Sequence, residues 1–134
     1  MTQPKQAGLE DVVAGTSEIC FIDGKEGRLL YRGFDIRDLA EHASFEEVVY
    51  LLWHGELPTR AQLDAFVQQI KAAQALPGQV LELIERIPPA THPMAALRTA
   101  VSYLGTLDPD QEDQSREANL RRATRLVAQF PTLV

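Results

Sequence analysis

A helical hydrophobic period, interrupted at short intervals by helix-capping residues, most limits what this chain can fold into. From residue 34 onward, apolar residues recur at spacings of three and four, and each run is bounded by a cap, a glycine or a proline. Ser44 with Glu47, and Thr59 with Gln62, have the spacing of a capping box, which satisfies two free amide groups at a helix start. The pattern predicts a succession of short helices.

Each expected helix has a start, a stop and an inner stripe. Asp35 caps the first, with Ile36, Leu39 and Ala40 inward, and the second, after Ser44, is apolar on more than one face and is expected to be largely buried. The expected stripes of the later helices are Leu63, Phe66, Val67 and Ile70; Val80, Leu81, Leu83, Ile84 and Ile87; Met94, Leu97, Ala100, Val101 and Leu104; and Leu120, Ala123, Leu126, Val127 and Phe130. The residues expected to mark helix boundaries are Gly55, Pro58, Pro77-Gly78, Pro88-Pro89, Pro93, Gly105 and Ser115.

The stretch ICFIDGKEGRLLYRGFDI, residues 19–36, does not follow the helical period. β-favouring residues at 17–22 and 28–32 flank a turn that contains Asp23, Gly24 and Gly27, and this arrangement predicts a β-hairpin over 17–33. A two-stranded hairpin is barely stable alone in water, so it must pack on another element. The predicted fold is therefore mainly α, an N-terminal β-hairpin followed by a helical array.

Length and charge limit the function classes. A chain of 134 residues with 45% hydrophobic residues can form one domain with a core, which we expect over residues 1–134. A net charge of -6 argues against binding to nucleic acid or to an anionic membrane, because both need clustered Lys and Arg. The lone Cys20 lies in an apolar run where a small buried thiol fits, and it can form no intramolecular disulfide. A reducing, cytoplasmic location is expected.

The two ends of the chain differ in polarity. The segment 1–16 carries Glu10 and Asp11 and lacks a continuous apolar run, so we expect neither a signal peptide nor a transit peptide, and no later run is long enough to span a bilayer. The final residues AQFPTLV, in contrast, include Phe130, Leu133 and Val134. Such an apolar end indicates either a terminal helix docked on its own core or an incomplete core, and we favour the second.

The three histidines are each expected to have a structural role. His42 and His54 fall in the last turns of predicted helices, where an imidazolium meets the negative end of the helix dipole. His92 precedes Pro93 at a helix start, where its ring can cap free amide groups or face a ligand, and we favour capping. No second acid, base or nucleophile is fixed near it in the sequence.

Metal and phosphate motifs are absent from the sequence. The histidines and Cys20 lack zinc-ligand spacing, and Gly24, Gly27 and Gly33 fit neither GxGxxG nor a P-loop. The acidic run at 108–113 lacks the EF-hand order. Arg116, Arg121, Arg122 and Arg125 are interspersed with Glu117 on the last helix of a net acidic chain, which favours a solvated face over binding of an anion or a partner. We expect a solvated acidic loop and a solvated helix face. No catalytic, cofactor-binding or metal-binding residue is assigned.

A series of short sequence motifs, in this order along the chain, resembles the N-terminal part of bacterial and archaeal citrate synthases. They are Gly8-Leu9, Ile22-Asp23-Gly24, Gly27, Tyr31-Arg32-Gly33, Ile36, Leu39, Phe45-Glu46-Glu47, Leu51-Leu52, Gly55, Leu57-Pro58, and His92-Pro93-Met94 with Arg98. The resemblance extends from about Gly8 to Val134. It implies that residues 34–134 form the helical part of the large domain, with the hairpin at its edge.

The resemblance also implies a function for a full-length protein. Citrate synthases are homodimeric acyltransferases of the tricarboxylic acid cycle, which condense acetyl-CoA with oxaloacetate to give citrate and CoA. The chemistry needs a base at the methyl group of acetyl-CoA and a hydrogen-bond donor at the developing oxyanion, in a closed and dry site. In the family, two histidines, an aspartate and the arginines that hold oxaloacetate lie beyond the part that matches this chain. His42, His54 and His92 do not match them.

We therefore expect this chain to be an N-terminal citrate synthase segment that supplies scaffold and is inactive alone. Two alternatives stay open. The first is a segment of 2-methylcitrate synthase, which shares these marks and differs in acyl-chain preference. The second is a stand-alone, non-catalytic interaction or assembly module. The sequence leaves open the oligomeric state of the isolated segment and whether any truncation is natural.

Overall fold

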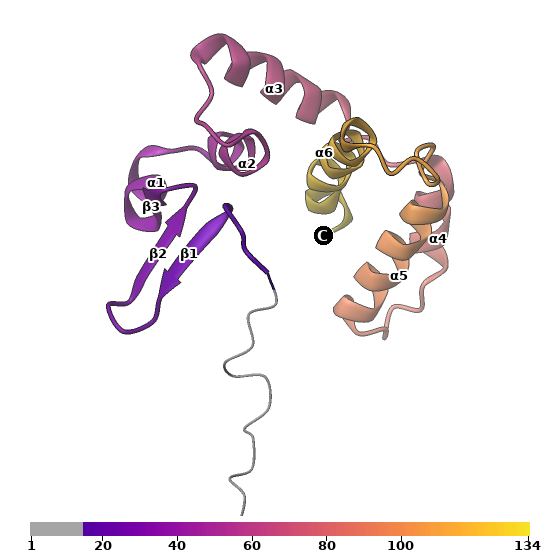
Figure 1. Cartoon of the computed structure of the whole chain (residues 1–134). Coiled ribbons are helices and arrows are strands. Elements are labelled where there is room, and N and C mark those ends of the chain that lie inside the picture. The colour runs from indigo at the N-terminus through magenta and orange to yellow at the C-terminus, as the bar shows by residue number, and fades with distance from the viewer. Residues whose placement is uncertain (1–14) are drawn as a thin grey trace, which may run out of the picture. The chain divides into compact units, whose positions relative to one another are not determined.

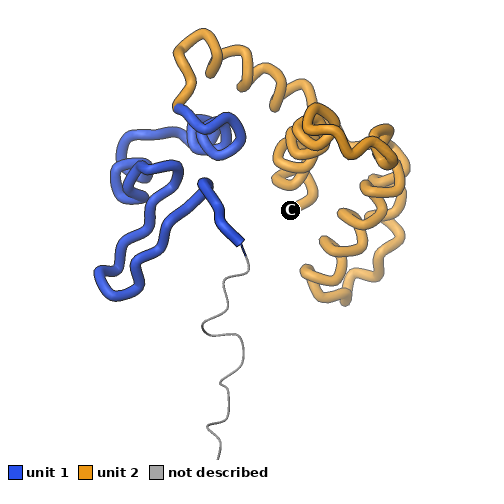
Figure 2. The backbone as a smooth tube through the Cα atoms, in the orientation of Figure 1, with its two compact units in different colours: residues 1–56 blue, residues 57–134 orange. Residues whose placement is uncertain are grey.

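The computed structural model describes residues 15–134 and is mainly helical with a small antiparallel sheet, which confirms the predicted fold class (Figure 1). The chain divides into two compact units, Met1–Glu56 and Leu57–Val134 (Figure 2). The expectation of one domain over 1–134 stays a prediction. Features assigned to residues 1–14, including Gly8-Leu9 and the expected lack of a leader, lie outside the described residues. In the described part, no helix combines the length and apolarity that crossing a membrane requires.

The first unit contains a sheet with strand order β1-β2-β3. Strand β1 (Cys20–Asp23) pairs antiparallel with β2 (Arg28–Tyr31), with Phe21 opposite Leu30, and β2 pairs with the short β3 (Phe34–Asp35). The Asp23 carboxylate accepts hydrogen bonds from the amides of Lys25 and Glu26 and so shapes the first turn. The predicted hairpin is confirmed, and β3 is an addition that the sequence pattern did not indicate.

Arg32 and Gly33 form the tight turn that adds the third strand. Both have positive φ, 48° and 90°, as a two-residue hairpin turn requires. The left-handed conformation is unfavourable for arginine, and the side chain makes compensating contacts. Its Nη2 donates to the Leu52 carbonyl oxygen at 3.3 Å, and its Nη1 lies 3.6 Å from the Glu18 carboxylate. This residue therefore joins the sheet to the end of the second helix.

Two capped helices complete the first unit. Helix α1 (Ile36–His42) begins where the Asp35 carboxylate accepts from the Arg37 amide. Helix α2 (Phe45–His54) begins with the predicted capping box and ends at Gly55, whose φ of 92° only glycine adopts without strain. In this box the Ser44 amide donates to Glu47 at 2.7 Å, and the Glu47 amide donates to the Ser44 hydroxyl at 3.3 Å. The sequence predictions for both helix starts are confirmed.

Replacing Ser44 by alanine is expected to destabilise the first unit by about 1 kcal/mol, because the Glu47 amide loses its acceptor. Ser44→Asp keeps an acceptor beside the same amide and is expected to preserve stability. Urea unfolding followed by the fluorescence of Trp53, the single tryptophan, measures the effect within α2 itself. Equal midpoints for the alanine variant and the unchanged protein would contradict the capping role.

The second unit consists of α3 (Arg60–Ala72), α4 (Gly78–Arg86), α5 (Pro93–Thr106) and α6 (Arg116–Leu133). The Thr59–Gln62 capping box, Pro93 in the first turn of α5 and the Ser115 cap of α6 are all confirmed. Helices α4 and α5 lie against each other, and α6 contacts both α3 and α5 (Figure 1). The side-chain amide of Gln129 on α6 donates to the carbonyl oxygen of Ala75, and the Thr132 hydroxyl donates to that of Gln74. Both acceptors follow α3.

The core of the described residues is small. The buried hydrophobic side chains are Leu39, Leu51, Phe66, Ile70, Val80, Ala100, Leu104, Ala118 and Ala128. Leu51 and Val80 are the largest that are fully buried. In α2, which was expected to be largely buried, only Leu51 is fully enclosed, so that expectation was too strong.

Other burial predictions were wrong. Cys20 is exposed because its side of β1 has no covering element among the described residues, and Ala40 is also exposed. The buried positions of α6 are Ala118 and Ala128, whereas Leu126 and Phe130 are 39% and 42% exposed. Small residues lie inward on α6 because they allow its backbone to approach the neighbouring helices closely. Gly105 does not end α5, which continues to Thr106.

Candidate functional site

The predicted candidate residues do not converge in the described part of the chain. His42 and His54 lie in the last turns of α1 and α2, and His92 is the N-cap of α5, as predicted. The His92 Nδ1 accepts from the Met94 amide at 3.2 Å, which confirms capping, and the His54 ring lies 4.2 Å from that of Tyr50. Within residues 15–134, no group of three or more His, Cys, Asp or Glu side chains is placed to hold a metal ion.

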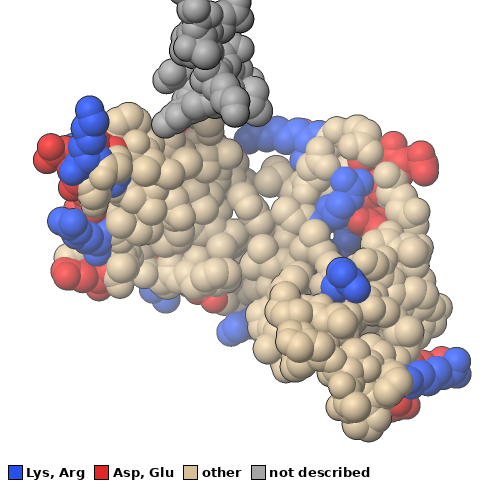
Figure 3. Space-filling model, turned by 90° about the horizontal axis from the view of Figure 1, so that it is seen from below, with Lys and Arg blue, Asp and Glu red and all other residues tan. Residues whose placement is uncertain are grey.

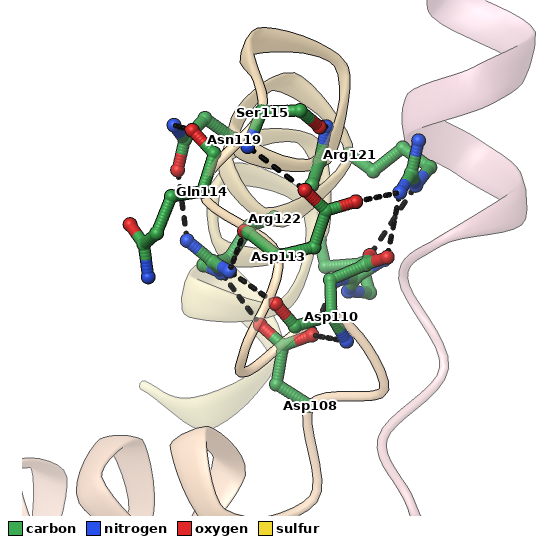
Figure 4. Close-up of polar contacts among 10 residues, drawn as sticks. Asp108, Asp110, Asp113, Gln114, Ser115, Asn119, Arg121 and Arg122 are labelled. Carbon is green, nitrogen blue, oxygen red and sulfur yellow. Dashed lines mark hydrogen bonds and ion pairs between the residues drawn. The ribbon is translucent and has the colours of Figure 1, made fainter.

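Among the described residues, aspartate and arginine side chains instead form a network of ion pairs. It joins the loop between α5 and α6 to the first turns of α6 (Figure 4). Asp108 lies 3.0 Å from the Arg122 Nε and 2.5 Å from the Arg125 Nη2. Arg125 also lies 2.7 Å from Asp110, so this guanidinium bridges two carboxylates.

The network extends to the start of α6. Arg121 lies 2.6 Å from Asp110 and 3.8 Å from Asp113. The Asp113 carboxylate accepts from the amide of Ser115, the residue that caps α6 (Figure 4). Arg122 also donates to the carbonyl oxygens of Asp110 and Asp113, so it holds the backbone of the loop as well as a side chain.

These contacts lower the pKa of the carboxylates. The hydrogen bond from Arg121, followed by that from Arg125, lowers the pKa of Asp110 from 3.8 to about 2. For Asp108, burial alone would raise the pKa, but the Asp110 amide, Arg125 and Arg122 outweigh it and the pKa falls. The amide of Ser115 lowers the pKa of Asp113, and Asp110 raises the pKa of Arg121. All these groups are therefore charged near neutral pH.

The expectation of a solvated acidic loop and a solvated arginine face was wrong for Asp108, Asp110, Arg122 and Arg125, whereas Arg121 and Asp113 are 51% and 50% exposed. The side chains of Asp108 and Asp110 are only 11% and 15% exposed, and those of Arg122 and Arg125 are 25% and 28% exposed. Elsewhere on the surface, Lys and Arg side chains lie beside Asp and Glu at several places (Figure 3). The sequence contained a signal, since Arg121 and Arg125 are four residues apart and share one face of the helix, next to an acidic loop.

A pocket of about 250 Å³ lies beside the network. Val101, Leu104, Leu107 and Leu126 give it apolar walls, and Asp108, Arg122 and Arg125 line its charged side. Because both arginines already contact carboxylates, the pocket presents neutralised charge. General acid–base chemistry needs a poised proton donor or acceptor in reach of a substrate, and the carboxylates here are already bound by guanidinium groups. The arrangement is suited to fixing the loop onto α6.

Comparison with known proteins places the chain in a family. A family model described as citrate synthase, C-terminal domain, matches residues 8–134. The chain belongs to the citrate synthase family. It is 45% identical to the citrate synthase of Deinococcus radiodurans and 43% identical to the 2-methylcitrate synthase of Mycobacterium tuberculosis, and each match covers 95% of this chain.

Solved citrate synthases share its fold. The structure from Pyrobaculum aerophilum matches 94% of the chain with a TM-score of 0.84 and 36% identity. The ternary complex from Thermoplasma acidophilum matches 98% with a TM-score of 0.85 and 25% identity. The chain covers 34% of the Deinococcus enzyme and 34% of the Pyrobaculum structure. The chain is therefore a citrate synthase segment that spans about a third of the length of the relatives that it matches.

Proposed function

We propose that this chain is the N-terminal scaffold segment of a citrate synthase that condenses acetyl-CoA with oxaloacetate and releases citrate and CoA. The match to citrate synthases over nearly the whole chain carries the proposal. The Thermoplasma acidophilum enzyme, whose fold the chain shares, forms a ternary complex with carboxymethyl coenzyme A and oxaloacetate. Assembly as a homodimer and a cytoplasmic location belong to the same proposal.

The way in which the described side chains are used supports the scaffold role. A condensation of this kind needs a base at the acyl methyl group and a donor at the oxyanion, converging on one small volume. The His92 Nδ1 is engaged as a helix cap, and the exposed His42 and His54 lie on separate helices. The network arginines Arg121, Arg122 and Arg125 each contact aspartates. The catalytic groups are therefore proposed to come from the part of the family chain that this chain does not match.

The isolated chain is expected to release no CoA from acetyl-CoA in the presence of oxaloacetate. Loss of the thioester absorbance is the suitable measurement, because the exposed Cys20 thiol would itself react with a thiol reagent. A citrate synthase relative assayed in parallel serves as the positive control. Turnover by this chain alone would refute the scaffold role.

A covalent hybrid tests the proposed function positively. This chain replaces the matched part of the Deinococcus radiodurans enzyme, and citrate formation is measured. Activity is expected because the two chains are 45% identical across the exchanged part. A hybrid that folds and remains inactive would contradict the proposal.

The relation to 2-methylcitrate synthases defines a second candidate substrate. The Mycobacterium tuberculosis enzyme is 43% identical over the same 95% of the chain. Because 2-methylcitrate has one methyl group more than citrate, its acyl donor is one carbon longer than acetyl-CoA. Assaying the hybrid with both acyl-CoA substrates shows whether this segment affects acyl-chain preference, and no change relative to the Deinococcus enzyme is expected from a scaffold.

A further inference from the structure

No further inference is drawn: the strongest candidate, the pocket of about 250 Å³ beside the aspartate–arginine network of the second unit, belongs to the site already described, where Asp108 and Asp110 already hold its two arginines, Arg122 and Arg125.

Discussion

Leu51→Ala is expected to lower the free energy of unfolding of the first unit by about 3 kcal/mol. Leu51 lies on α2 and is fully buried, with 0% of its surface exposed. Its truncation removes buried apolar surface and leaves a cavity that a helix fixed by its capping box and by Gly55 cannot easily close. Because few large side chains are fully buried in the described residues, the loss removes a substantial part of the core.

The measurement is urea unfolding monitored by Trp53 fluorescence, which reports on the same helix. Phe45→Ala is the control, because it truncates a larger side chain on the same helix at a position that is 66% exposed. The control is expected to cost less than about 1 kcal/mol, since the phenylalanine already contacts water. If both variants lost the same stability, Leu51 would not be the core residue that its burial indicates.

Arg125→Met is expected to destabilise the second unit by about 2 kcal/mol, the typical scale for hydrogen bonds to a charged group. The methionine retains apolar volume next to Leu126 and removes the guanidinium that bridges Asp108 and Asp110. Asp108, whose side chain is 11% exposed, then depends on Arg122 alone among the arginines. Urea unfolding followed by circular dichroism measures the change.

The control for Arg125→Met is Arg60→Met on α3. Arg60 and Asp64 form an ion pair one helical turn apart, with side chains 85% and 60% exposed. Exposed pairs of this type contribute about 0.3–0.5 kcal/mol, so little change is expected. A similar loss in both variants would show that the network contributes no more to the free energy of unfolding than a surface ion pair does.

The network also predicts how stability depends on pH. The folded-state pKa of Asp110, about 2, is below its ordinary value of 3.8, so the unfolded chain binds the proton more tightly. The stabilisation is therefore complete above pH 4 and is lost as the pH falls from about 4 through 2. Arg125→Met is expected to flatten this dependence, because it removes one of the two arginines that lower the pKa.

The local structure was predictable because its causes lie close together in the sequence. Ser44 and Glu47 are three residues apart, and Asp35 directly precedes its helix. Hydrogen bonds over such short separations form in any context that allows the helix or turn. The cap role of His92 was predictable on the same basis.

The burial of individual side chains depends on partners that are distant in sequence. The periodicity placed Leu126 and Phe130 inward, but small alanines face the neighbouring helices in the folded unit. The pattern on one helix shows which residues are apolar and does not show what another helix places opposite them. Cys20 illustrates the same point, since a strand with an apolar sequence is exposed where no described element covers it.

By itself, the sequence determined the mainly helical class, the hairpin, the helix starts and the resemblance to citrate synthases, because all of these depend on local order along the chain. Tertiary structure alone decided the pairing of Asp108 and Asp110 with Arg125, across separations of 17 and 15 residues. It also decided that α4, α5 and the end of α6 enclose an apolar groove. The physical reason is that charge pairing and burial depend on distances in space, which the chain sets only when its helices pack.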